Sequence, residues 1–154
     1  MMQLISAKDQ RETFKNLYSL YVYDLTEGTP MLGGMINAKG MYEPPHGLDE
    51  TIDTTDAYVI MSDDKPVGIV NFIEGKEADY CVQEIFIIRP FRRKGIATDV
   101  INNYLSNKHG SFMVHILKGS TDAISFFESY FKEKGMEARR EERDAIAWNY
   151  FTSL

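Results

Sequence analysis

The sequence has one cysteine, Cys81, and none of its apolar runs approaches the length that a membrane span requires. A single cysteine cannot form an internal disulfide, and its apolar neighbours favour a buried thiol. The three histidines are scattered, so no group of cysteine and histidine residues has the spacing of metal ligands. The N-terminal residues also lack the basic start and apolar stretch of a signal peptide. These absences predict a cytoplasmic protein that holds no metal and does not contact a membrane.

An excess of basic residues is absent as well. The net charge of −6 and the isoelectric point near 5.1 argue against binding to nucleic acid, which requires a basic surface. An acidic surface instead concentrates amines, so a cationic substrate fits the charge. The length of 154 residues and the hydrophobic content of 44% suit one domain with its own core, and we expect a single domain over residues 1–154.

Hydrophobic spacing along the chain predicts a mixed α/β fold. The predicted helices are 9–25, 95–105 and 121–134, and the predicted strands are 3–6, 57–61, 67–73, 81–88 and 112–117, followed by two strands in the C-terminal tail. A helix between strands 81–88 and 112–117 makes them parallel neighbours by a right-handed crossover. Residues 26–55 are rich in glycine, proline and polar residues, and this composition predicts a long functional loop.

The segment 84–101 carries the most informative pattern, in which a buried strand runs into a basic turn that opens a helix. The first N–H groups of a helix lack partners within it and carry the positive end of its dipole. Gly95 and Ala97 leave room for a phosphate near this backbone, and the three basic residues before Gly95 add charge. The segment therefore predicts an anion site. It matches neither G-x-x-x-x-G-K-[ST] nor G-x-G-x-x-G.

The spacing R-x-x-G-x-A, formed by Arg92, Gly95 and Ala97, resembles the pyrophosphate loop Q/R-x-x-G-x-G/A of the GNAT acetyltransferases. Ile87 extends the match, because the family has a hydrophobic strand residue at this distance before the glycine. The wider run E-x-F-I-x-R-x-F-R-R-K-G looks like a bacterial branch of predicted acetyltransferases within that superfamily.

The resemblance continues after strand 112–117. The family pattern N-x-x-A-x-x-[FL]-[YFW], followed by a glycine and a hydrophobic residue, is matched by Ser120, Ala123, Phe126, Phe127, Gly135 and Met136. Two positions depart from it. Ser120 replaces the usual asparagine, and Phe127 stands where many members have a tyrosine that can act as a general acid.

The resemblance implies a GNAT-like fold, which is a mixed, mostly antiparallel sheet with a central, splayed parallel strand pair and flanking helices. It also implies direct transfer of an acetyl group from acetyl-CoA to an amine while both are bound. The acceptor would be a small-molecule or peptide amine, and the resemblance leaves a homodimer open. The residues implied to bind the cofactor are Ile87, Arg92, Arg93, Lys94, Gly95, Ile96, Ala97, Thr98, Ser120 and Phe127.

Transfer to an amine needs a proton acceptor, because alkyl amines are mostly protonated at neutral pH and only the neutral form attacks. Glu84 on the splayed strand and His115 on its partner are the candidates, although a lone histidine in a strand is more often structural. Tyr130 is a candidate acid for the leaving thiolate, although core packing is its simpler interpretation. The first helix and the long loop offer candidate acceptor-site residues: Tyr18, Tyr21, Tyr23, Asp24, Glu43 and His46.

Another class of function stays open beside catalysis. Because Phe127 lacks a hydroxyl group, the chain could instead be a non-catalytic acetyl-CoA-binding module that senses the cofactor or docks a partner. A nucleic-acid-binding function would depend only on the basic cluster 89–94, and it conflicts with the net charge of −6. We also expect the loop 26–55 and the first helix to close over the acceptor, because the loop's length and glycines are typical of a mobile lid.

Overall fold

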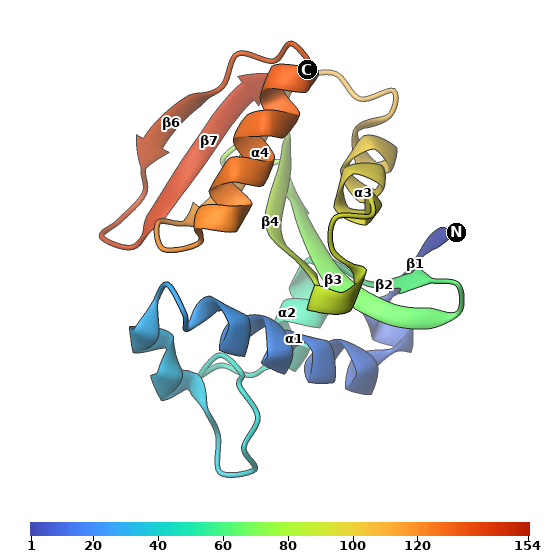
Figure 1. Ribbon diagram of the computed structural model, residues 1–154, viewed down its shortest axis with the longest axis vertical. Coiled ribbons are helices and arrows are strands. Elements are labelled where there is room, and N and C mark those ends of the chain that lie inside the picture. The colour runs from blue at the N-terminus through green and yellow to red at the C-terminus, as the bar shows by residue number, and fades with distance from the viewer.

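The computed structural model describes the whole chain, Met1–Leu154, as a seven-stranded sheet flanked by helices (Figure 1). The strands lie in the order β1-β2-β3-β4-β5-β7-β6, and only the pair β4–β5 is parallel. Their bounds are β1 Met2–Ser6, β2 Asp56–Ser62, β3 Lys65–Glu74, β4 Tyr80–Ile87, β5 Ser111–Leu117, β6 Arg139–Glu142 and β7 Ala147–Ser153. The predicted mixed, mostly antiparallel sheet with a central parallel pair is confirmed.

The helices cover both faces of this sheet (Figure 1). Their bounds are α1 Arg11–Leu25, α2 Leu48–Thr54, α3 Ile96–Leu105 and α4 Thr121–Glu133, with short 3₁₀ helices at Ala7–Asp9, Pro30–Met35 and Arg89–Phe91. The core is divided accordingly, because successive side chains of a strand point to opposite faces. On β3, Ile69 packs with α1 and α2, whereas Val70 packs with α3 and α4. None of the helices is both long and apolar enough to cross a membrane.

The parallel pair β4–β5 opens after a short paired stretch. Its register runs only from Tyr80 opposite Phe112 to Val82 opposite Val114. On its other side, β4 carries a bulge at Gln83, because Phe72 of β3 pairs with Val82 but Asn71 pairs with Glu84. Bulges bend a strand and increase its twist. The bulge therefore directs the second half of β4 away from β5, and this divergence confirms the splayed pair that the family resemblance implied.

The prediction of one long loop over residues 26–55 is wrong in part. This stretch holds a 3₁₀ helix at Pro30–Met35 and the helix α2, whose Leu48 and Ile52 are buried against the sheet. Between them, the Tyr42 N–H donates to Ser19 Oγ of α1 at 2.9 Å. Helix α2 has only seven residues, so its single apolar pair is too short to produce a helical pattern in the sequence.

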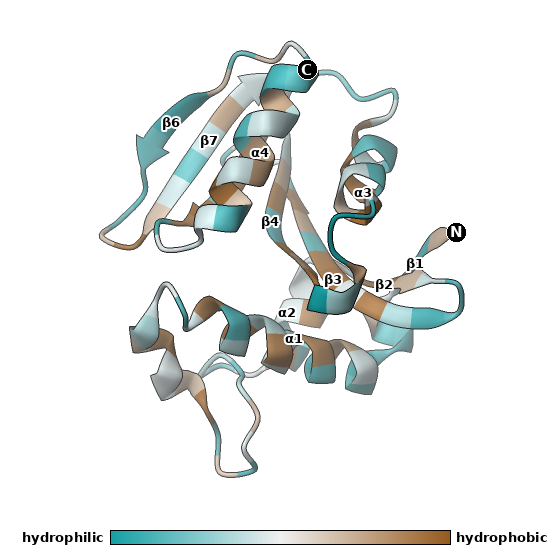
Figure 2. Ribbon diagram, viewed as in Figure 1, coloured by the Kyte–Doolittle hydropathy of each residue, from teal (hydrophilic) through white to brown (hydrophobic).

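The last two strands follow the prediction for the C-terminal tail. The charged strand β6 lies at the edge of the sheet and is hydrophilic along its length, whereas β7 carries the apolar residues (Figure 2). Charged side chains on an edge strand discourage pairing with another chain. Strand β7 lies beside β5 and thus supports one side of the β4–β5 opening.

Candidate functional site

The N-terminus of α3 presents a row of backbone donors. The first hydrogen bond of the helix runs from the Asp99 N–H to the Gly95 carbonyl group at 2.9 Å. None of the N–H groups of residues 93–98 donates a hydrogen bond within the chain. Gly95 and Arg93 have positive φ angles of 80° and 61°, and successive N–H groups in such turns form a concave anion site. The predicted segment Gly95–Thr98 is therefore placed as an anion site requires.

The three basic residues of the turn lie differently. Arg93 and Lys94 are exposed beside the helix terminus. The Arg92 guanidinium group instead turns toward α1, where Nη2 lies 3.0 Å from Asp24 Oδ2. Its Nε donates to the Ile87 carbonyl oxygen at 2.7 Å, at the end of β4. The expectation that Arg92 adds its charge at the helix terminus is thus corrected, because its guanidinium group is turned toward a carboxylate of α1.

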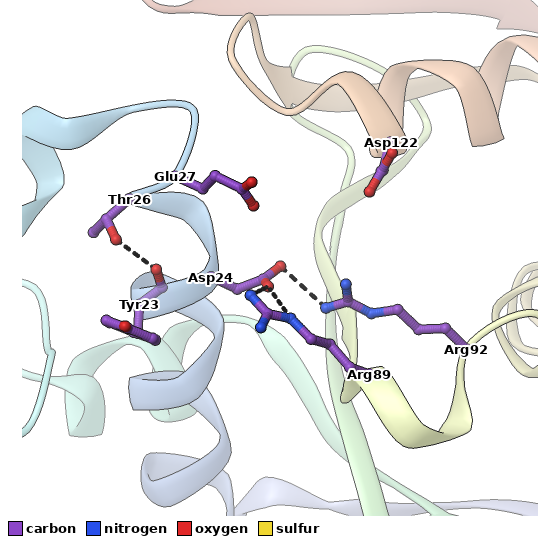
Figure 3. Close-up of a pocket in the computed structure, with 7 residues that line it drawn as sticks. All are labelled: Tyr23, Asp24, Thr26, Glu27, Arg89, Arg92 and Asp122. Carbon is purple, nitrogen blue, oxygen red and sulfur yellow. Dashed lines mark hydrogen bonds and ion pairs between the residues drawn. The ribbon is translucent and has the colours of Figure 1, made fainter.

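A polar pocket of about 440 Å³ lies between α1, the Arg89–Phe91 turn and α4 (Figure 3). Arg89 also binds Asp24, at 2.9 Å from Nη2 to Oδ1, so two arginines meet on one carboxylate. The carboxylates of Glu27 and Asp122 point into the remaining space in Figure 3. The pocket is lined by Tyr23, Asp24, Thr26, Glu27, Arg89, Arg92 and Asp122. Its wall therefore carries charges of both signs, and the two arginines stand on the side of β4.

The segments on either side of the splayed strands touch through two glycines. Gly28 follows α1 and Gly119 precedes α4, and a Cβ atom on Gly28 would lie 2.0 Å from the Gly119 carbonyl oxygen. A Cβ atom on Gly119 would lie 2.1 Å from the Gly28 carbonyl oxygen. Only glycine permits this approach of two backbones. The contact joins the N-terminal half of the molecule to the β5–α4 loop at the pocket.

Glu84 lies on the splayed half of β4 and faces α1. Its Oε1 accepts a hydrogen bond from Asn71 Nδ2 at 3.3 Å, and the side chains of Tyr18 and Tyr21 surround the carboxyl group. Burial raises the pKa of Glu84 to about 7, although hydrogen bonding to Tyr18, Asn71 and Tyr21 favours the ionised form. Burial likewise raises the pKa values of Tyr18 and Tyr21, with the Glu84 charge as a second cause. Glu84 is therefore a carboxyl group that exchanges its proton near neutral pH.

His115 lies on β5 and points to the same side of the sheet as Glu84. On β3, Asn71 contacts Glu84, and Ile73, two residues further, packs with Met113 of β5. His115 follows Met113 by two residues and so shares its face. The Nδ1 atom of His115 lies 3.0 Å from Asn149 Oδ1 on β7. The two predicted proton acceptors thus lie on the diverging strands and on one side of the sheet.

The structure places three other predicted residues in or near the core. Tyr130 is 4% exposed, and its hydroxyl group donates to Asn102 Oδ1 of α3 at 2.8 Å. Phe127 is 2% exposed and packs against neighbouring aromatic rings of α4. Ser120 stands at the start of α4 without a side-chain capping bond. The structure does not join Tyr130 with Glu84 or His115, because its hydroxyl group is tied between α3 and α4.

The acceptor-site candidates divide into two groups. Helix α1 brings Tyr18 and Tyr21 to Glu84, and it brings Tyr23 and Asp24 to the pocket. The two loop residues lie elsewhere. Glu43 contacts Asn37, and His46 lies beside Thr51. Sequence reasoning missed Asn71 and Asn149, which meet their partners through strand pairing, and Glu27 and Asp122, which only the tertiary fold brings to the pocket. No three side chains of histidine, cysteine, aspartate or glutamate lie together as metal ligands would.

Comparisons with known proteins agree with this arrangement. A model of the Acetyltransferase (GNAT) family matches residues 17–131, and no curated protein matches the sequence. An acetyltransferase from Thermus thermophilus has a similar structure, with a TM-score of 0.66 and 15% identity over 100% of this chain and 97% of that one.

Two further solved structures contain ligands. The diaminobutyrate acetyltransferase of Paenibacillus lautus, in complex with L-2,4-diaminobutyric acid and coenzyme A, has a TM-score of 0.62 and 13% identity over 99% of this chain and 93% of that one. An Arabidopsis thaliana protein in complex with the bisubstrate analogue CoA-Ac-MVNAL has a TM-score of 0.57 and 14% identity over 99% of both chains. At these identities the likeness concerns the fold.

Proposed function

The chain belongs to the GNAT acetyltransferase family, and on that premise we propose that it transfers an acetyl group from acetyl-CoA to an amine within a ternary complex. Acyl transfer from an acyl-CoA is the activity of the family. One observation carries the assignment to this site. The row of free N–H groups at the start of α3 lies directly after β4, the strand that diverges from β5. With its pyrophosphate at these donors, acetyl-CoA would extend the rest of its chain along the free edge of β4.

Each part of the cofactor site has a physical role. The N–H groups of residues 93–98 and the dipole of α3 would hold the pyrophosphate, with Arg93 and Lys94 adding charge. Ile87 lies on the edge of β4 that has lost its β5 partner. Its carbonyl oxygen currently accepts from Arg92, so a bound arm at this edge would compete with Arg92 for it. The ion pair with Asp24 would then retain the displaced guanidinium group.

Glu84 is the proposed general base. The acceptor ammonium loses a proton to the carboxylate, and the nitrogen lone pair then attacks the thioester carbon. The carbon–sulfur bond breaks as the amide forms, and the CoA thiolate leaves and takes up a proton. A base with a pKa of about 7 is partly ionised near neutral pH, so it can accept a proton and holds it well enough for transfer. The side chains of Tyr18 and Tyr21 would orient the carboxylate and exclude water.

Phe127 favours a second candidate function, a non-catalytic acetyl-CoA-binding module. Its buried ring cannot donate a proton to the leaving thiolate, and the Tyr130 hydroxyl group is already bonded to Asn102. A module of this kind would bind acetyl-CoA at α3 and release no thiol. The two functions therefore differ in one measurable product.

Release of free CoA thiol upon addition of amines distinguishes them. The chain is incubated with acetyl-CoA and a panel of diamines, amino acids and short peptides, and reactions without an acceptor correct for hydrolysis. An acetyltransferase releases thiol and forms a product heavier by one acetyl group with at least one amine. Tight cofactor binding without thiol release for any member of a broad panel would instead support the binding module.

A further inference from the structure

A chain of polar side chains leads from His115 across β7 to the turn between β3 and β4. His115 Nδ1 lies 3.0 Å from Asn149 Oδ1, and Asn149 Nδ2 donates to Glu77 Oε2 at 3.2 Å. Glu77 Oε1 accepts from Arg143 Nη1 at 2.7 Å. These residues come from distant parts of the sequence, so the tertiary fold alone assembles the chain.

The order of the chain decides where the proton of His115 resides. The Glu77 carboxylate faces a guanidinium group, is negatively charged and can only accept hydrogen bonds. Asn149 must therefore turn its NH₂ group toward Glu77 and its carbonyl oxygen toward His115. A carbonyl oxygen also only accepts, so Nδ1 of His115 must carry a hydrogen. In the neutral ring, Nε2 then holds the free lone pair.

Burial makes this arrangement costly to reverse. Asn149 is 4% exposed, so water cannot replace either of its partners. A flip of its amide group would set a carbonyl oxygen against the Glu77 carboxylate and an NH₂ group against Nδ1 of His115. Both contacts would leave the buried amide atoms of Asn149 without a suitable partner, although Glu77 itself is exposed. The fold therefore selects a single tautomer of His115.

We propose that Asn149, held in place by Glu77, is a positioning residue that presents Nε2 of His115 as a second proton acceptor beside the β4–β5 opening. This inference rests on the proposed acyl transfer. A proton leaves the acceptor ammonium group, binds Nε2 and later passes to solvent, while the bond from Nδ1 to Asn149 stays intact. No member of the chain has to move during this exchange, because the carbonyl oxygen accepts from the neutral and the charged ring alike.

Several charged groups lie on the His115 side of the sheet, among them the ion pair of Arg139 and Glu141 on β6, where Glu141 lies opposite Asn149. Glu77 lies in the β3–β4 turn and Arg143 in the β6–β7 turn, and their opposite charges compensate each other. Strand β4 contributes Glu84 and the buried thiol of Cys81. Burial raises the pKa of Cys81 to about 12, so this thiol is neutral at working pH. Glu84 is then the other candidate proton acceptor on this side of the sheet, and its contribution must be separated from that of His115.

The tautomer can be measured without any activity. Nitrogen NMR of the full-length protein, with ¹⁵N-labelled histidine and His115→Gln for assignment, should show a protonated Nδ1 and an unprotonated Nε2 in the neutral ring. Asn149→Leu should convert this state into a mixture of tautomers. A matched control, Thr152→Val, removes a different buried hydrogen-bonding side chain from β7 and should leave the spectrum of His115 unchanged. A mixture, or a protonated Nε2, in the wild type would overturn the proposal.

The role in proton transfer is tested in the Glu84→Gln background, where His115 is the remaining candidate proton acceptor. Adding Asn149→Leu should lower kcat by roughly tenfold at fixed KM for acetyl-CoA, less than the roughly 10²–10⁴ expected when a base is removed, because the ring itself is retained. Adding the control Thr152→Val in the same background should leave kcat unchanged. An unchanged kcat with Asn149→Leu would overturn the role as proton acceptor. Wild-type protein that turns over no amine would contradict the proposed function, whereas the NMR result would still decide the tautomer.

Discussion

Replacing Glu84 by glutamine should lower the rate of acetyl transfer and change how stability depends on pH. The amide has the shape of the carboxyl group and can still accept from Asn71, but it cannot take a proton. The loss of a general base lowers rates by roughly 10²–10⁴, so kcat should fall by that factor while the affinity for acetyl-CoA changes little. The acidic limb of the wild-type profile near pH 7 should disappear with the carboxyl group.

The effect on stability follows from the same pKa. In the folded protein the pKa is raised from 4.5 to about 7, so folding disfavours the ionised carboxylate. The protein therefore loses stability as the pH rises from the pKa of Glu84 in the unfolded protein to its pKa in the folded protein. Above that range the stability stays lower. At 1.36 kcal/mol per pKa unit the cost is about 3 kcal/mol, as an upper bound because the side chain is half-buried.

Glutamine carries no charge, so its burial does not lower the stability in this way. Between about pH 4.5 and pH 8, the free energy of unfolding of Glu84→Gln should rise relative to wild type by up to about 3 kcal/mol. Urea unfolding of both proteins at several pH values measures the difference, and thiol release measures the rate. A variant with wild-type rates and a stability difference that is independent of pH would refute the assignment of Glu84 as a buried general base. The role would then pass to His115 or to solvent.

Three further predictions concern the surrounding structure. Tyr130→Phe should reduce kcat by less than about tenfold, since the hydroxyl group is bonded to Asn102; a loss of roughly 10²-fold or more would identify Tyr130 as the acid for the leaving thiolate. Gly119→Ala should weaken acceptor binding and stability together, because its Cβ atom would meet the Gly28 carbonyl oxygen, and an unchanged KM for the amine would show that the contact does not shape the pocket. Hydrogen exchange of residues 33–46 should slow when acetyl-CoA and an acceptor are both present, whereas exchange that is slow without ligands would contradict the closure of this segment over the acceptor.

The sequence predicts the parts of the fold whose pattern is local. The helical face of α3 is visible in the sequence, because apolar residues recur at helical spacing directly after a basic turn and a glycine, whereas the use of that turn rests on the family resemblance. The splay of β4 from β5 was available only through the family resemblance. The structure attributes it to the bulge at Gln83, which no periodicity of the strand reveals.

The polar partners of the site are less predictable. Glu84 and His115 stand out because charged or titratable residues are unusual in apolar strands. Asn71, Asn149 and Asp24 do not, since their roles depend on which strand or turn lies opposite. The prediction for Arg92 shows the same limit, because its charge was assigned to the neighbouring helix terminus but is paired with α1. The sequence pattern predicts on which element a charged residue lies, but its ion-pair partner depends on the tertiary structure.

Calorimetric titration of acetyl-CoA into Gly95→Val tests the central claim, that the start of α3 holds the cofactor. Gly95 has a φ angle of 80°, which a β-branched residue adopts only with strain, and valine would crowd a phosphate at the N–H groups. Gly135→Val is a matched control, because Gly135 has a φ angle of 67° and equally open surroundings but lies at the end of α4. We predict that Gly95→Val loses acetyl-CoA binding, while Gly135→Val binds as wild type and circular dichroism shows both variants folded. Wild-type affinity in folded Gly95→Val would contradict the claim.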